Sequence, residues 1–193
     1  MIPKKLTKYL EDSGLKYEVI EHRTVYTAYD AAQTMHVKLN QIAKSLLIKI
    51  NKPLEHGQKP YVIVIVPADK NIDLNKLPRV MTTKELRITK ASIPKENVMK
   101  DQFKVKPGAM AAFGSFYKLP IFVDKSLVGV CVFSSGSFNE SIKIKVADFI
   151  KLEQAKVGIF SVAKKMKKSK VKVKPKAKPK SKPIVKKKTK KRK

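Results

Sequence analysis

Residues 41–66 read QIAKSLLIKINKPLEHGQKPYVIVIV, and this stretch decides the fold. Its two ends, residues 45–50 and 61–66, are short apolar runs, as expected of strands that lie buried inside a sheet. The ten residues between them contain two prolines and one glycine, which are typical of an exposed hairpin loop. We therefore expect two neighbouring strands in the middle of a sheet.

Outward from this pair, segments with helical spacing and segments with strand-like composition follow one another irregularly. Leu6 and Leu10 lie four residues apart on one helical face that Gly14 ends, and Asp73 is expected to cap a short helix. Strands joined sometimes by helices and sometimes by turns favour an α+β fold with a mixed sheet over a doubly wound parallel sheet. The expected helices are residues 2–13, 29–36, 39–44, 94–100 and 147–154, and the further strands are residues 16–22, 121–124, 130–134 and 141–145.

The charge of the chain is concentrated at its C-terminal end. The 193 residues include 44 Lys or Arg against 15 Asp or Glu, a formal net charge of +29. Residues 163–193 hold 18 of the basic residues, three prolines and no acidic residue, which leaves +11 on residues 1–162. Repulsion and proline prevent such a segment from burying apolar area, so we expect one domain, residues 1–162, and a disordered Lys-rich tail, residues 163–193.

Several functional classes are disfavoured by what the sequence lacks. It has no apolar run of 18 residues and no signal-peptide pattern at its start, so we expect a cytoplasmic protein without a membrane partner. A single cysteine and three scattered histidines give no internal disulfide and no zinc spacing, and we expect no metal or cofactor. Phosphate-binding glycine loops, HExxH, GxSxG and CxxC motifs are missing too. Cys131, within an apolar run, is expected to be a buried residue rather than a nucleophile.

Three features remain as candidates for chemistry. Lys44 stands at the entrance to the first buried strand, and two loops of small residues, 108–114 and 134–136, lie at strand ends. Small residues allow backbone amides to approach a ligand closely. From composition alone, Lys44 is more readily interpreted as a surface lysine, one of 44 basic residues.

In this order and spacing, four stretches of the chain resemble the YbaK/prolyl-tRNA synthetase-associated editing domain family. They are residues 16–50, 62–77, 105–127 and 132–152, and the resemblance spans roughly residues 3–160. It implies a mixed, partly barrel-like sheet flanked by helices. It also implies an aminoacyl-tRNA deacylase that acts in trans on a Cys-tRNA(Pro)- or Ala-tRNA(Pro)-type substrate without a cofactor. A catalytically silent tRNA- or RNA-binding module and a regulatory domain that binds a synthetase are the alternatives.

The resemblance also implies roles for particular residues. Lys44, in AKSL, matches the family's lysine before a buried strand, whose ammonium can pair with the acceptor end of tRNA. Gly108 begins the loop that matches Gly-Gly-x-x-Pro-hydrophobic-Gly, and a backbone amide there would stabilise the oxyanion of ester hydrolysis. We expect Lys44 and Gly108 to be catalytic. Ala109 replaces the second glycine of the motif, while Phe113 and Gly114 keep the pattern. A tight connecting loop is the alternative reading.

The remaining substrate-binding expectations concern a third motif and one histidine. Ser134, Ser135 and Gly136 match the family's Ser-Gly-Gly, with a serine in place of the first glycine, and Ser141 stands where relatives often carry Asp. His22 lies at a family-like position before the Ala-rich helix and is expected to line the cleft. The substrate-binding set is thus His22, Ala109, Phe113, Gly114, Ser134, Ser135 and Gly136. The alternatives are a turn hydroxyl for Ser134 and a structural role for His22.

The expected partner is tRNA through its mischarged acceptor end, with a prolyl-tRNA synthetase as a further possible partner. The tail lies outside the resemblance, so its role rests on charge alone. Lys-rich segments bind nucleic acid through counterion release without sequence specificity. Ribosomal RNA, DNA, an anionic membrane or no partner at all remain open for the tail.

Overall fold

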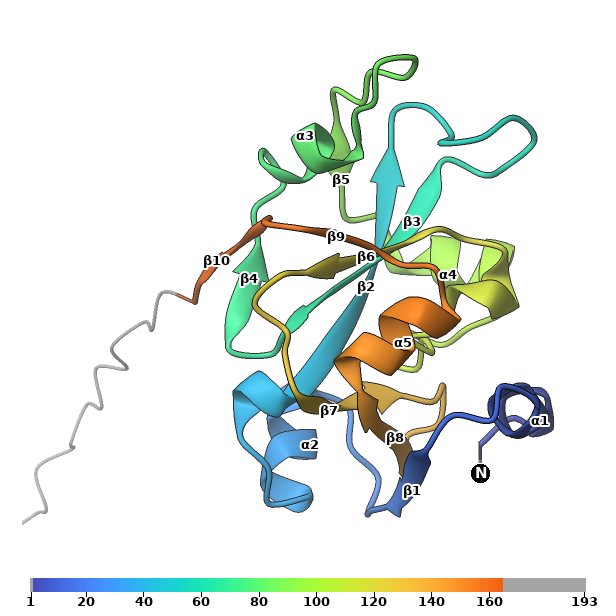
Figure 1. The fold of residues 1–193 in the computed structure, drawn as a ribbon, viewed down its shortest axis with the longest axis vertical. Helices are drawn as coiled ribbons and strands as arrows, with labels where there is room; N and C mark the ends of the chain where they lie inside the picture. Colours follow the sequence, from blue (N-terminus) through green and yellow to red (C-terminus); the bar gives the residue numbers. More distant parts are fainter. Residues whose placement is uncertain (1, 165–193) are drawn as a thin grey trace, which may run out of the picture.

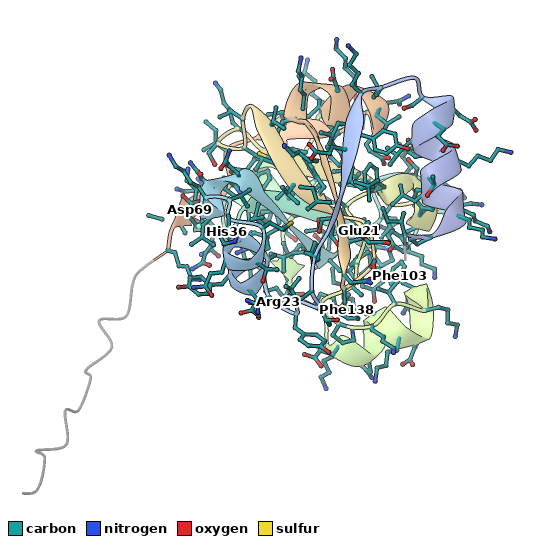
Figure 2. All side chains as sticks on the ribbon, turned by 90° about the horizontal axis from the view of Figure 1, so that it is seen from below. Glu21, Arg23, His36, Asp69, Phe103 and Phe138 are labelled. Carbon is teal, nitrogen blue, oxygen red and sulfur yellow. The ribbon has the colours of Figure 1, made fainter. Side chains whose placement is uncertain are left out.

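A computed structural model describes residues 2–164 of the chain (Figure 1). From residue 165 on, the predicted tail lies outside the described residues. Basic side chains project from much of the described surface (Figure 2). None of the helices within residues 2–164 has the length and apolar character needed to cross a membrane.

An eight-stranded mixed sheet forms the centre of the fold. β2 and β3 pair antiparallel in its middle, as predicted, whereas β2–β7, β3–β6 and β6–β9 pair in parallel. The predicted α+β class with a mixed sheet is thereby confirmed. Along the sheet the order is β1 (Tyr17–Glu21), β8 (Glu140–Lys145), β7 (Val130–Ser134), β2 (Ile42–Ile50), β3 (Tyr61–Pro67), β6 (Ile121–Asp124) and β9 (Lys156–Gly158), and β5 (Ala91–Ser92) pairs with β2.

Apolar clusters on both faces explain why β3 is apolar throughout. Its alternate residues Ile63 and Ile65 belong to one buried cluster, and Val62, Val64 and Val66 to another. Because successive strand side chains point to opposite faces, a strand covered on both sides needs no polar position. All seven residues of β3 are buried.

Helices supply the covers for the two faces. α1 (Lys4–Asp12), α4 (Glu96–Phe103) and α5 (Val146–Leu152) pack on the Ile63 side, and α3 (Leu77–Met81) packs on the Val64 side. α2 (Ala28–Thr34) forms a smaller cluster with β2 and β7. Figure 1 shows α2 and α5 at the end of the sheet that β7 and β8 occupy.

The helix predicted for residues 39–44 is wrong. Only a single 3-10 turn, η1 (Leu39–Gln41), forms, and β2 begins at Ile42. Ile42 and Ala43 pair with Val132 and Phe133 of β7, so sheet pairing overrides the local helical spacing. Lys44 therefore lies within a strand, not at the end of a helix.

The segment after β3 also differs from the prediction. Asp73 does not cap α3, whose N-cap is Lys76; its carboxylate instead accepts hydrogen bonds from the backbone amides of Asn75 (3.0 Å) and Lys76 (3.2 Å) in a turn. Just before it, β4 (Lys70–Ile72) pairs antiparallel with β10 (Ser161–Ala163) to form a separate two-stranded sheet. The end of the described chain is thus attached to the segment that follows β3.

A buried carboxylate holds this C-terminal segment in place. Asp124, at the end of β6, is 1% exposed and accepts hydrogen bonds from the amides of Phe160 (2.9 Å), Ser161 (2.8 Å) and Ser126 (3.0 Å) and from both serine hydroxyls. Burial alone would raise its pKa, but these hydrogen bonds outweigh it and hold the pKa below the usual value. Asp124 therefore fixes the approach to β10.

Candidate active site

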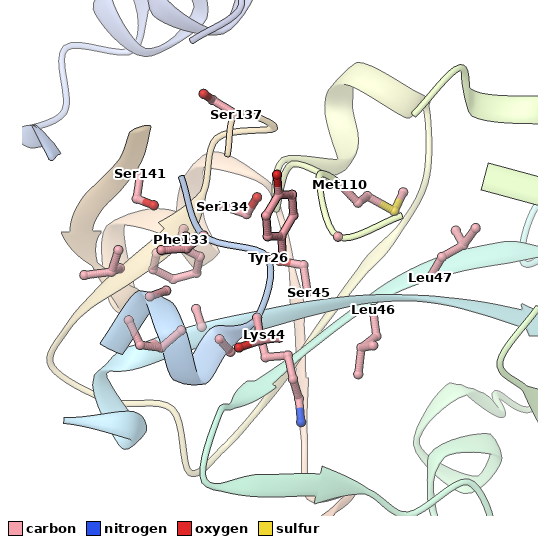
Figure 3. A pocket seen from close by; sticks show the side chains of 18 of the residues that line it. Tyr26, Lys44, Ser45, Leu46, Leu47, Met110, Phe133, Ser134, Ser137 and Ser141 are labelled. Atoms are coloured by element: carbon pink, nitrogen blue, oxygen red, sulfur yellow. The ribbon is translucent and has the colours of Figure 1, made fainter. Parts of the chain in front are cut away.

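A pocket of about 370 Å³ lies where α2, β2, β7 and the loop around Gly108 meet (Figure 3). His22, Lys44, Gly108 and Ser134 all line it, so four of the predicted residues share one cavity. Sheet register explains part of this convergence. β2 and β7 run in parallel with Ile42 opposite Val132, and Lys44 and Ser134 each follow two residues later.

Lys44 is half-buried and bonded to a neighbouring strand. Its Nζ donates a hydrogen bond to the carbonyl oxygen of Lys70 in β4 at 2.8 Å. Figure 3 shows the Lys44 side chain directed away from Ser134 and Ser137, with its ammonium on the other side of β2. Burial, reinforced by the positive charge of Lys164, lowers the pKa of Lys44, while Asp69 opposes the change. An ammonium has three donors, so this bond leaves two for an anionic or carbonyl ligand.

The loop at Gly108 brings backbone amides to the pocket. Gly108 has a φ of +82°, a conformation that side-chain-bearing residues rarely adopt. The amides of Ala109, Ala111 and Ala112 already donate to Lys106 O, Tyr117 Oη and Ser134 O. Within residues 2–164, the amides of Gly108 and of Met110 make no such bond, and both residues line the pocket. Met110 was missed in the sequence because a backbone amide leaves no side-chain signature.

Phe113 and Gly114, expected to bind substrate, lie in the core. Phe113 is fully buried, and its ring contacts that of Phe149 with centroids 5.4 Å apart. A Cβ on Gly114 would lie 2.3 Å from the carbonyl oxygen of Leu119. Neither residue lines the pocket, so their position suits the support of the loop rather than contact with a ligand.

Ala109, Ser135 and Gly136 line a second pocket of about 450 Å³. Along residues 108–111 and 134–138, residues of this second pocket are interspersed with residues of the first. Ser135 is fully buried; its hydroxyl donates to Glu140 O at 2.6 Å and accepts from Ser137 N at 3.2 Å. This is the geometry of a turn-stabilising serine. Ser134 also accepts a hydrogen bond from the amide of Gly136 at 3.3 Å, while lining the first pocket.

His22 and Ser141 form a polar pair in the wall of the first pocket. His22 Nδ1 lies 2.9 Å from Arg23 O, and Nε2 lies 2.9 Å from Ser141 Oγ. A carbonyl oxygen only accepts, so Nδ1 donates to it, and in the neutral ring Nε2 accepts from the serine hydroxyl. Ser141 is paired directly with Ser134 across β7 and β8. The pocket thus has a row of polar groups on one side.

Ser45 adds a hydroxyl that the sequence analysis did not single out. It lines the pocket, and its Oγ is buried without a hydrogen-bond partner among the residues that the structure describes. A buried unpaired hydroxyl is costly, and a polar ligand group would satisfy it. No sequence pattern signals Ser45, because its unpaired state depends on the residues that surround it in the folded chain.

Cys131 is placed in the core, and we expect it to take no part in chemistry. It is fully buried, and burial raises the pKa of its thiol to about 11. Its thiolate is therefore scarce at neutral pH. We expect Cys131→Ala to keep ester hydrolysis unchanged and the native protein to resist alkylation by iodoacetamide. Loss of turnover without loss of stability would contradict this expectation.

The sequence of the chain is similar to those of known proteins. The sequence model of the family described as "Aminoacyl-tRNA editing domain" matches residues 22–152. The prolyl-tRNA editing protein ProX of Acetoanaerobium sticklandii is 27% identical over 124 residues, which cover 62% of this chain and 70% of that protein. The multifunctional Ser/Thr-tRNA deacylase ProXp-y of Escherichia coli is 24% identical over 153 residues, covering 78% of this chain and 87% of the relative.

Solved structures show the same fold. A crystal structure of a candidate trans-editing enzyme for prolyl-tRNA synthetase superposes with a TM-score of 0.68 at 18% identity, covering 84% of this chain and all of that one. The crystal structure of hypothetical protein APE2540 gives a TM-score of 0.69 at 16% identity, with 82% of this chain covered. The family model spans more than half of the chain and includes the pocket residues His22, Lys44, Gly108 and Ser134. The chain therefore belongs to the aminoacyl-tRNA editing domain family, as its four motifs predicted, and is a deacylase of aminoacyl-tRNA.

Proposed function

We propose that this deacylase removes a small aminoacyl group, alanyl, cysteinyl or seryl, from mischarged tRNA of the tRNA(Pro) type. The observation that carries the proposal is the convergence of Lys44, the Gly108 loop and a row of hydroxyls on one pocket. The resemblance implies the Cys-tRNA(Pro)- or Ala-tRNA(Pro)-type substrate. The multifunctional Ser/Thr-tRNA deacylase relative and the buried hydroxyl of Ser45 support adding the seryl group.

The pocket supports catalysis mainly by position and electrostatics. In hydrolysis, a water oxygen bonds to the ester carbonyl carbon, the bond from that carbon to the ribose oxygen breaks, and the ribose oxygen takes up a proton. The amides of Gly108 and Met110 are available to the oxyanion that forms on the carbonyl oxygen. Lys44 supplies a cation for the phosphate or ribose of the acceptor end, and pocket size limits the aminoacyl group.

The test is a deacylation assay on a panel of charged tRNAs. Alanyl, cysteinyl, seryl and threonyl esters on tRNA(Pro) are compared with prolyl-tRNA(Pro) and with the same amino acids on their cognate tRNAs. We expect hydrolysis of one or more small esters and sparing of the prolyl ester. Sparing of every small ester on tRNA(Pro), or equal hydrolysis of the prolyl ester, would contradict the proposed substrate.

The tail is proposed to bind the phosphate backbone of the same tRNA. Support comes from its charge and from its point of departure. Lys164 lies close enough to Lys44 to lower the pKa of that residue, so the tail follows from a point near the pocket. Each Lys–phosphate contact releases a counterion and steepens the salt dependence of binding.

We expect deletion of residues 165–193 to weaken tRNA binding and to flatten its dependence on salt. The cut follows β10 and leaves the described domain whole. The measurement is the slope of log Kd against log salt for both proteins, with a tail of equal length and neutral composition as control. An equal slope for the deleted and full-length chains would show that the tail is passive.

A further inference from the structure

An aromatic pair stands on the rim between the two pockets and takes no part in the chemistry described above. The side chain of Tyr26 is 70% exposed, and its ring centroid lies 5.2 Å from that of Phe138 at an interplanar angle of 52°. Tyr26 lines the pocket that contains Lys44, and Phe138 lines the second pocket. Figure 3 shows the Tyr26 ring beside Ser134 and Met110, and Figure 2 marks Phe138.

Backbone contacts fix the position of this pair. Val25 N donates to Phe138 O at 2.9 Å, and His22 N donates to Asn139 O at 2.9 Å, so the segment before Tyr26 is joined to the loop that carries Phe138. Gly108 lies against both. A Cβ on Gly108 would lie 3.4 Å from Tyr26 O and 3.6 Å from Phe138 Cε1. The aromatic pair is therefore held next to the loop whose amides face the pocket.

The charge around the pair suits a polyanion. Lys104 and Lys106 line the second pocket beside Phe138, and both are exposed. No Asp or Glu is among the residues that line either pocket. Proteins that bind unpaired nucleotides combine these two elements, aromatic rings for the bases and cations for the backbone. An apolar protein partner would not call for the flanking lysines.

We propose that Tyr26 and Phe138 form a stacking platform for the unpaired nucleobase next to the aminoacyl ester, with Lys104 and Lys106 placed for the adjoining phosphate. The proposal rests on the proposed function. The ester is attached to the 3′ end of the tRNA, so an ester in the first pocket places that end beside Tyr26 and Phe138. Stacking there positions the ester without touching the reacting atoms. Tyr26 is thus a positioning residue.

The test uses the full chain and an RNA minihelix whose unpaired 3′ end carries 2-aminopurine in place of the terminal adenine. Stacking quenches 2-aminopurine fluorescence, so the signal reports the platform independently of hydrolysis. We expect the wild type to quench, Tyr26→Phe to keep the quenching, and Tyr26→Leu to lose it and to weaken binding about tenfold. Tyr29→Leu is the matched control, since Tyr29 is 54% exposed on α2 but does not line the pocket.

Each outcome bears on the proposal. The proposal would be overturned if Tyr26→Leu quenched the fluorescence as much as the wild type does, or if Tyr29→Leu lost as much quenching as Tyr26→Leu. A wild type that binds the RNA without quenching, or that does not bind it, would overturn the proposal too. The proposed function is judged separately by the panel assay. Quenching that depends on Tyr26 in a protein that spares every tRNA(Pro) ester would keep the platform and remove the proposed substrate. If Tyr26→Leu hydrolysed the ester with unchanged kcat and KM, the platform would be removed and the proposed substrate kept.

Discussion

Lys44→Ala is expected to lower kcat/KM for ester hydrolysis by about 100-fold or more, a loss of about 2.7 kcal/mol of transition-state stabilisation, with the fold intact. Lys44 is half-buried in the pocket wall, so its ammonium acts where water screens charge poorly. Its only recorded partner among the described residues is the carbonyl of Lys70, and no carboxylate holds it in an ion pair. The measurement is steady-state deacylation of the best substrate of the panel.

Two variants separate charge from packing. Lys44→Met keeps most of the apolar stem and removes the ammonium, so it should be nearly as inactive as Lys44→Ala. Lys49→Ala changes an exposed lysine of the same strand and should behave as the wild type. Unchanged turnover in Lys44→Ala would refute the assignment of this pocket.

The lowered pKa of Lys44 adds a pH dependence to the same experiment. In the proposed mechanism the ammonium form binds the substrate, so activity that depends on it is present at low pH and is lost as pH rises through the pKa of Lys44. Because that pKa is lower than usual, the loss should begin at a lower pH than for an ordinary lysine. The residual activity of Lys44→Met should lack this alkaline decline.

The second large effect concerns stability. Asp124→Ala is expected to lower the free energy of unfolding by about 3 kcal/mol or more, because the buried amides of Phe160 and Ser161 would lose a charged acceptor. Asp124→Asn, which keeps the shape, should cost less. Urea unfolding at pH 7 measures both, and Asp101→Asn, at an exposed position on α4, is the control.

The pH dependence of this effect has a definite sign. The pKa of Asp124 is lowered by folding, so the stability that its charge contributes is fully present above the unfolded pKa of about 3.9. It is lost as pH falls through the lower pKa of the folded state. The difference between wild type and Asp124→Asn should therefore shrink in acid. A difference that stays constant down to pH 2 would show that the carboxylate is not held in its charged form.

The sequence predicted those helices and strands that are determined by the local pattern of their own residues. Residues 121–124 and 130–134 form β6 and β7 with the predicted bounds, since short apolar runs rich in β-branched and aromatic residues and bounded by turns favour strands. The strands β4, β9 and β10 have three residues each and exist through their pairing partners, so no local pattern indicates them. The same cause turned the expected helix at 39–44 into the start of β2.

The site divides in the same way. Lys44, Gly108, Ser134 and His22 were found through motifs and do meet at one pocket. Sequence motifs did not indicate the backbone amide of Met110, the hydroxyl of Ser45 or the exposed ring of Tyr26. These groups reach the pocket only because the tertiary structure brings particular loops and strands together. Phe113 and Gly114 match the motif and were expected to bind substrate, but the structure places both in the core. A residue can therefore match a motif because packing requires it.

The pairing of β10 with β4 has a consequence for how this protein can be shortened or tagged. Lys70 is opposite Ala163 in that pair, and its carbonyl oxygen also accepts the hydrogen bond from Lys44. A chain that ends before Ser161 would remove the strand that steadies this carbonyl, and with it the resting position of the pocket's cation. In the proposed mechanism these last residues before the basic segment therefore support the lysine of the pocket, and a cleavage site or affinity handle belongs after Lys164.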